Sequence, residues 1–179
     1  MGKTFNEISA DLKKWIEKQK MFFVATAPLS PDLHINCSPK GLDSFRILDP
    51  FTVAYQDLTG SGIETIAHIR ENKRILLMFC AFDGPPKIVR LHGLGEAITP
   101  EHQDFENLNL QFPFKRGRRA YIRITLTRIS DSCGYSVPLY EFVKHRDVLD
   151  KWVEAKTDEQ LKEYRLAKNT ESIDGLKGL

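Results

Sequence analysis

The chain has 179 residues, of which 41% are hydrophobic and 28% charged, and its formal net charge at neutral pH is +2. This length buries a substantial core without disulfide cross-links, and the composition excludes an intrinsically disordered chain. The small cationic excess argues against a protein that binds nucleic acid mainly by neutralising phosphates. Three well-separated cysteines give neither a disulfide framework nor a metal-binding motif.

No secretory signal opens the sequence, and no apolar run is long enough to cross a bilayer. A cytoplasmic protein without a membrane partner is therefore expected.

The first half of the chain is predicted to combine two helices with short strands. Apolar residues recur at spacings of three and four over residues 5–16, after Thr4 and Glu7 in the pattern of a capping box. Strands are predicted at residues 21–27 and 34–40, and a hairpin at 45–48 and 51–55 turns about Asp49-Pro50. A polar, Gly-containing segment at 56–62 leads to a helix over 63–72.

The second half is predicted to contain the longest strands. Residues 74–82 are mostly apolar, which indicates burial on both faces, and residues 87–98 follow after a Gly-Pro turn. Thr99 and Pro100 are predicted to open a short helix, and residues 120–129 alternate as a strand. A loop after Asp131 leads to a charged helical tail from about residue 141 to 168.

This order predicts a mainly β fold with peripheral α-helices, a six- to seven-stranded antiparallel split β-barrel. Most connections are too short for the crossover helices that a doubly wound parallel sheet requires. We expect residues 1–140 to form the barrel domain with its N-terminal helix, and residues 141–179 to form a helical tail packed on it.

A segment between a strand and a helix has the composition of a phosphate-binding loop. In Thr59-Gly60-Ser61-Gly62 the glycines let the backbone turn its N–H groups outward. Thr59, Ser61 and Thr65 add hydroxyl donors, and the following helix N-terminus adds partial positive charge. The segment matches neither the Walker A nor the GxGxxG pattern, and a plain turn in which Ser61 caps the helix is the alternative.

Three polar residues follow a period of two on the strand over 34–40. Asn36, Ser38 and Lys40 therefore point to one face, where an amide, a hydroxyl and an ammonium group gather. A solvated edge strand would have the same pattern. If this strand runs beside the Thr59–Gly62 segment, the two features predict a phosphorylated, ring-bearing ligand, with Lys40 at the phosphate and Asn36 and Ser38 donating to the ring.

These residues resemble the pyridoxamine 5'-phosphate oxidase-related FMN-binding family. The resemblance covers most of residues 20–142 and is carried by the runs HINCSPKG (34–41), YQDLTGSG (55–62), RILLMF (74–79), VRLHG (89–93) and CGYSVP (133–138).

The resemblance implies an FMN-binding split barrel and a homodimer with the flavin at the subunit interface. The residues it places along the flavin are Asn36, Ser38, Pro39 and Lys40, with Tyr55 on the neighbouring strand. Those near the phosphate are Ser61, Gly62 and Thr65, in the loop that also contains Thr59 and Gly60.

The sequence departs from true pyridoxamine phosphate oxidases at three places. The strand over 34–40 has no Arg, Ile88 stands where the family has a Gln, and residues 143–146 (VKHR) replace the family's Arg-Leu-His-Asp-Arg motif that holds the vitamer. FMN binding is therefore expected without pyridoxamine phosphate oxidation. Relatives that use the deazaflavin F420 or haem leave these two cofactors as alternatives.

We expect an oxidoreductase that transfers electrons or hydride through FMN, and a noncatalytic flavin or haem carrier is the alternative. No side chain stands out as a catalytic acid or base. His92 is interpreted as a barrel residue, His68 as a surface residue and Cys133 as a structural loop cysteine. The basic cluster at residues 115–119 is interpreted as a solvated loop, the other possibility being contact with a phosphorylated substrate or RNA.

Overall fold

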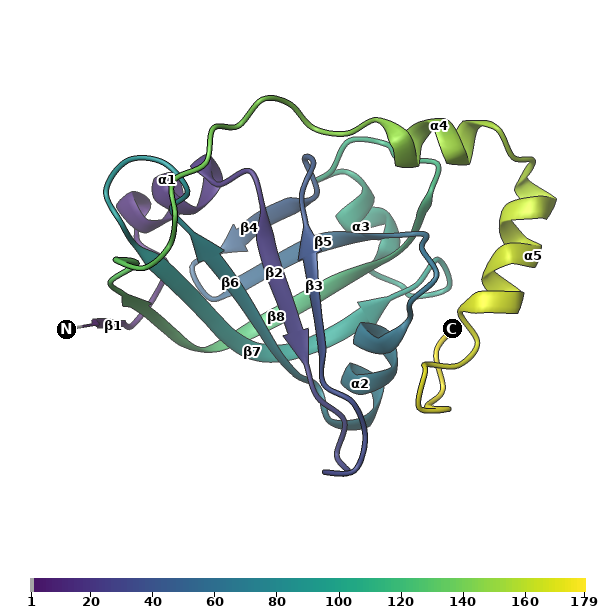
Figure 1. Cartoon of the computed structure of the whole chain (residues 1–179). Coiled ribbons are helices and arrows are strands. Elements are labelled where there is room, and N and C mark those ends of the chain that lie inside the picture. The colour runs from purple at the N-terminus through teal and green to yellow at the C-terminus, as the bar shows by residue number, and fades with distance from the viewer. Residues whose placement is uncertain (1) are drawn as a thin grey trace.

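One antiparallel sheet runs through most of the chain in the computed structural model, which describes residues 2–179 (Figure 1). Its strands are β1 (Thr4–Phe5), β2 (Phe22–Thr26), β3 (Asn36–Lys40), β4 (Phe45–Asp49), β5 (Thr52–Leu58), β6 (Arg74–Cys80), β7 (Ile88–Ile98) and β8 (Arg118–Ser132). The helices are α1 (Ala10–Lys18), α2 (Glu64–Asn72), α3 (Phe105–Asn109), α4 (Val148–Glu154) and α5 (Asp158–Lys168).

The sheet curls like a barrel that is not closed. Its strand order is β3-β2-β6-β7-β8-β5-β4, with β1 added to β8, and every pairing is antiparallel. The hydrogen-bonded path ends at β3 and β4. The predicted mainly antiparallel split barrel is therefore confirmed, and the short β1 is one strand more than expected.

Buried side chains form a large cluster on one face of the sheet and a smaller one, around Tyr121, on the other. Alternate strand residues such as Val24, Leu77 and Ile122 are completely buried. Helices α1 and α2 contribute Ile16 and Ile66 to the same cluster. This arrangement leaves few buried positions for polar groups, so the polar side chains that are buried stand out.

Two helix starts differ from their predicted positions. Thr4 does not cap α1 but pairs with Ser130 in the sheet, and the Ser9 side chain caps the helix instead by accepting a hydrogen bond from the Leu12 N–H at 3.3 Å. Helix α3 begins at Phe105, several residues after the predicted start at Thr99. At Thr4 the local capping pattern was outweighed by pairing with β8, whereas Thr99 accepts from the His102 N–H in a turn that precedes α3.

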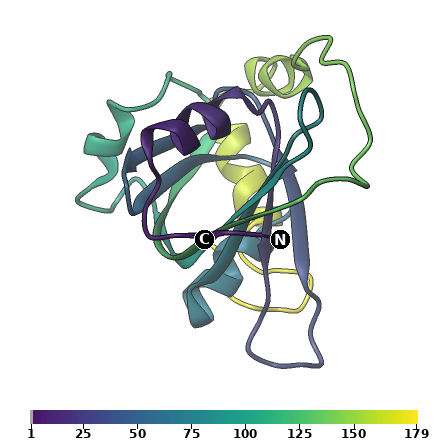
Figure 2. The ribbon, with the colours of Figure 1, turned by 90° about the vertical axis from the view of Figure 1, so that its left-hand side faces the viewer.

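The C-terminal part contains two helices where one was predicted. Residues 133–147 have no helix or strand and run along the molecule to α4, and α5 follows after a break at which Thr157 forms a capping box with Gln160 (Figures 1 and 2). Among residues 2–179, none of the helices has both the length and the apolar character needed to span a membrane.

The basic cluster at residues 115–119 joins the barrel to these helices. Lys115 pairs with Asp150 at 2.7 Å and Arg116 with Asp158 at 2.7 Å, while a side chain on Gly117 would collide with Val153. The cations are therefore occupied within the protein, so the solvated-loop interpretation was wrong, and they are not presented together to RNA.

Candidate functional site

The predicted polar face of β3 is present at one edge of the sheet. Asn36, Ser38 and Lys40 are half-buried on one side of the strand, and Cys37 and Pro39 are exposed on the other. Pro39 therefore does not share the face of the other three predicted cofactor residues. The alternation follows from the extended backbone, which sends successive side chains to opposite faces.

A chain of hydrogen bonds connects this face to β2 and α2. Ser38 donates to Asn36 Oδ1 at 3.0 Å, and Asn36 Nδ2 donates to Thr26 Oγ1 at 3.2 Å and to Thr65 Oγ1 at 3.0 Å. Both amide hydrogens of Asn36 are thus used inside the protein. Asn36 therefore orients Ser38 and Thr65, and it would have to give up one of these bonds to donate to a ligand.

His68 terminates the hydrogen-bond chain at its buried end. Its Nδ1 lies 3.0 Å from Thr26 Oγ1, and burial, the main cause, lowers the pKa of the imidazole. Which of the two atoms donates in this hydrogen bond depends on the tautomer of the imidazole. His68 is completely buried, so its interpretation as a surface residue was wrong. It stabilises the arrangement of Asn36 from beneath.

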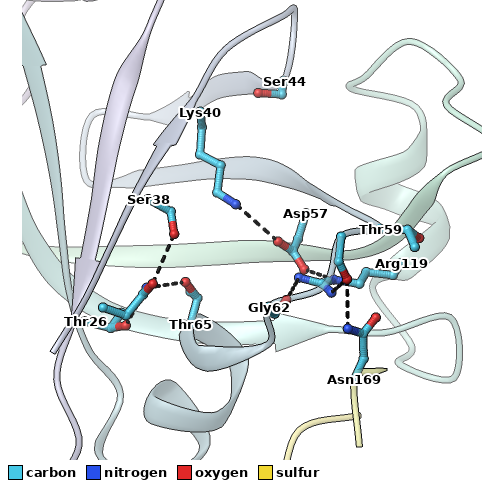
Figure 3. A network of polar contacts seen from close by, with 12 residues as sticks. Thr26, Ser38, Lys40, Ser44, Asp57, Thr59, Gly62, Thr65, Arg119 and Asn169 are labelled. Atoms are coloured by element: carbon cyan, nitrogen blue, oxygen red, sulfur yellow. Dashed lines mark hydrogen bonds and ion pairs between the residues drawn. The ribbon is translucent and has the colours of Figure 1, made fainter. Parts of the chain in front are cut away.

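The Thr59–Gly62 segment is fixed from behind by side chains that are distant in sequence. Arg119 donates to the carbonyls of Gly60 at 3.3 Å and Gly62 at 2.8 Å, and Asn169 donates to the Gly60 carbonyl at 2.9 Å. Thr59 is held through its N–H and its hydroxyl, both donating to the Gly117 carbonyl. The carbonyl groups of Gly60 and Gly62 therefore face the protein, and Figure 3 shows Arg119 and Asn169 beside this segment.

The N–H groups of the same segment are left for a ligand. Within residues 2–179, the backbone N–H groups of Gly60, Ser61 and Gly62 donate to no protein acceptor, and the Ser61 side chain is exposed. Helix α2 starts immediately afterwards, with no side-chain cap at its N-terminus. Outward N–H groups beside a helix N-terminus are the arrangement that binds phosphate.

Positive charge is concentrated around this segment. Asp57 is almost completely buried, with Arg119 at 2.5 Å and Lys40 at 3.9 Å, and Figure 3 shows the Lys40 side chain directed toward it. Arg165 donates to Thr59 Oγ1 at 3.0 Å. Two cations thus flank one carboxylate, and a third lies beside Thr59. Burial and the repulsion of neighbouring guanidinium groups, Arg119 first, lower the pKa of Arg165, as expected where positive charge is in excess.

The remaining predicted residue, Tyr55, lies in the core. Its ring packs edge-on against Phe22 at 5.7 Å, and its hydroxyl is buried without a hydrogen-bond partner within residues 2–179. Burial, followed by the nearby Asp57 charge, raises the pKa of this phenol well above its ordinary value. The hydroxyl is therefore a neutral donor.

The structure thus brings together Asn36, Ser38 and Thr65, and places Lys40 beside the Asp57–Arg119 pair. Residues that were not predicted for the site support it: Thr26 and His68 next to the β3 face, and Arg119, Arg165 and Asn169 behind the loop. Arg119 had a signal in the sequence as part of the basic cluster, and His68 had been interpreted as a surface residue. No group of three or more His, Cys, Asp or Glu in the described chain is arranged to hold a metal ion.

Comparison with known proteins gives the family by sequence, and solved structures share the fold. Residues 8–133 match the family model described as pyridoxamine 5'-phosphate oxidase. The chain is 38% identical over 192 residues to the pyridoxamine 5'-phosphate oxidase family protein ustO of Aspergillus flavus, with 98% of this chain and 77% of that protein covered.

Solved structures with a similar fold include HupZ of Group A Streptococcus, with a TM-score of 0.52 and 23% identity, covering 68% of this chain and 91% of that one. A putative pyridoxamine 5'-phosphate oxidase of Lactobacillus delbrueckii has a TM-score of 0.53 and 17% identity, with 71% and 98% covered. A FAD-binding protein of Mesorhizobium loti has a TM-score of 0.51 and 15% identity, with 73% and 96% covered. From the family-model match and the Aspergillus relative, the chain belongs to the pyridoxamine 5'-phosphate oxidase family.

Proposed function

We propose that this protein binds FMN noncovalently and acts as an oxidoreductase, as a homodimer with the flavin at the subunit interface. The observation that carries the proposal is the loop at residues 60–62, whose backbone N–H groups have no acceptor within residues 2–179, with Lys40, Arg119 and Arg165 close to the loop. Membership of the family and the flavin-binding description of the Mesorhizobium protein support a flavin as the ligand.

The residues present fit the two ends of FMN. The phosphate would be held by Gly60, Ser61, Gly62 and Lys40, because the loop donors and one mobile ammonium group complement a dianion. Ser38 keeps lone pairs and Thr65 keeps its hydroxyl hydrogen for a polar ring edge, since the other groups of their network are engaged with each other. FMN, when bound, supplies the hydride or electron chemistry, which needs no acid–base pair from the chain.

The absorption spectrum of the purified protein tests this proposal. We expect the two characteristic bands of oxidised flavin, either as purified or after FMN is added and the excess removed. Haem or F420 would be recognised by their own spectra, and a colourless protein that fails to retain FMN would refute flavin binding.

Anaerobic addition of NADPH or NADH then separates the enzyme from the carrier. Bleaching of the flavin bands at a rate that rises with the nucleotide concentration is expected of an oxidoreductase. A flavin that stays oxidised with both nucleotides but is reduced by dithionite would favour a carrier. Sedimentation of the FMN-loaded protein tests the homodimer.

A further inference from the structure

A groove separate from the Thr59–Gly62 segment lies at the end of the barrel where β3 terminates. Its volume is about 710 Å³, within the range of small-molecule sites. It is bounded by the end of α1, the end of β3, the turn between β6 and β7, and the segment at residues 140–146. The groove includes Lys40, which also belongs to the proposed flavin site.

The walls of the groove carry more positive charge than the whole chain has in excess. Five Lys or Arg side chains and two carboxylates line the groove, which gives it a formal charge of +3, whereas the net charge of the chain is +2. The cationic residues are Lys18, Lys20, Lys40, Lys144 and Arg146, and the acidic ones are Asp83 and Glu141. Within the described chain, Lys20, Lys144 and Arg146 form neither an ion pair nor a side-chain hydrogen bond, so their charge is available to a ligand. The basic residues at 115–119, by contrast, are engaged with acceptors in the protein.

Aromatic rings line the same groove. Phe82 and Tyr140 lie 5.5 Å apart, and the Tyr140 N–H donates to the Phe82 carbonyl at 2.8 Å, which attaches the 140–146 segment to the β6–β7 turn. Phe142 lies under the Lys20 ammonium, 5.8 Å from ring centroid to Nζ, yet half of its surface is exposed. Exposed rings beside unpaired cations suit a planar anion, which gains both ring contact and charge attraction.

We propose that this groove binds a small planar organic acid, with its anionic group toward Lys20, Lys144 and Arg146 and its ring against Phe142 and Tyr140. The binding site stands on the groove alone. We further infer that this acid is the substrate of the oxidoreductase, because Lys40 belongs both to the groove and to the proposed flavin site. This second step rests on the proposed function. The residues at 143–146 that depart from the family's vitamer motif are, in this chain, part of the wall that selects the acid.

Isothermal titration of the purified protein with naphthalene-2-carboxylate and with its neutral amide tests the charge requirement. The two probes have nearly the same shape, so a difference in affinity reports the charge. We expect the carboxylate to bind at least about tenfold more tightly, or about 1.4 kcal/mol, and the difference to shrink as salt is raised. Equal affinities, or no binding of the carboxylate, would overturn the proposal.

Substitutions on two walls locate the binding. The double variant Lys144→Gln and Arg146→Gln, and separately Lys20→Gln on the other wall, are expected to weaken the carboxylate several-fold and leave the amide unchanged. Lys162→Gln on α5 is the control, because this lysine is exposed and outside the groove. Near-ultraviolet circular dichroism verifies folding. Unchanged carboxylate affinity in both groove variants would place the probe elsewhere and refute the assignment.

Repeating the titration at saturating FMN separates this proposal from the proposed function. Carboxylate binding that persists with FMN bound supports a site beside the flavin, whereas stoichiometric displacement by FMN would show that the groove holds the cofactor and would overturn the proposal. Charge-dependent carboxylate binding by a protein that does not bind FMN would uphold the groove as an acid site and refute the flavoprotein function instead.

Discussion

Replacing Asp57 by Asn tests whether the buried ion pair holds the phosphate-binding loop. The substitution keeps the size of the side chain and removes its charge, so Arg119 becomes a buried cation without its partner at 2.5 Å. Lys40, at 3.9 Å, loses its nearest carboxylate as well. Arg119 would then have only neutral acceptors, namely the carbonyls of Gly60 and Gly62 and the amide oxygen introduced at position 57.

The expected cost follows from burial. Both side chains of the pair are almost completely inaccessible, and breaking such a pair by removing one partner typically costs about 3–5 kcal/mol. For a chain of this size that lowers the melting temperature by roughly 6–20 °C. Urea unfolding followed by tryptophan fluorescence measures the free energy, and thermal unfolding gives a second value.

A matched substitution provides the control. Glu17→Gln removes one carboxylate charge from an exposed pair with Lys13 at 3.8 Å, and should change the free energy of unfolding by less than about 1 kcal/mol. The double variant Asp57→Asn with Arg119→Met should recover part of the loss, because no uncompensated charge stays buried. If Asp57→Asn were no more destabilising than Glu17→Gln, the account of the loop as held by a buried ion pair would be refuted.

Three further predictions concern the same region. Lys40→Ala and Ser61→Ala should each weaken FMN binding, by roughly 1.5–3 kcal/mol where a charge-assisted phosphate contact is lost; flavin fluorescence titration measures this, and unchanged affinity in both would refute the phosphate placement. Glu64→Gln should tighten FMN binding by about two- to fivefold at low salt, because the Glu64 carboxylate folds back against Gly62 and repels a phosphate there; a weakening would contradict this. Burial lowers the pKa of His68 in the folded protein, so the unfolded chain binds the proton more readily. The free energy of unfolding is therefore unaffected by this group above pH 6.5, the ordinary pKa of histidine, and decreases as the pH falls below that value. In the variant His68→Gln, the free energy of unfolding should therefore decrease less when the pH is lowered from 7 to below 6.5. An unchanged pH dependence would show that His68 is not responsible.

The features that the sequence predicted well are those set by local geometry. Asn36, Ser38 and Lys40 share a face because an extended strand alternates, whatever it pairs with. The Gly-Ser segment before α2 is likewise recognisable from its own residues. Both could be identified without knowing the rest of the fold.

The groups that support the site could not be predicted in this way, because their contacts span the chain. Arg165 and Asn169 reach the loop from more than one hundred residues away, through helices whose docking depends on the completed barrel. Thr4 had a plausible local role as a cap, but pairing with β8 across the molecule prevailed.

His68 was misplaced because α2 is buried on more than one side. The helix packs on the sheet, and the C-terminal residues lie against it, with the Arg70 guanidinium donating to the Gly178 carbonyl and a side chain on Gly178 colliding with Ile63. A single apolar stripe in the sequence indicates one buried face, whereas His68 lies on a polar position that contacts Thr26 on β2.

Comparing the affinities of FMN and riboflavin for the purified protein tests the central claim most directly. The two ligands share the ring and differ in the phosphate, which the loop and Lys40 are proposed to hold. The account predicts that FMN binds at least about tenfold more tightly than riboflavin, a difference of about 1.4 kcal/mol or more, and that Lys40→Ala removes much of it. Equal binding of both ligands would contradict the phosphate site, and binding of neither would contradict the assignment of the protein as a flavoprotein.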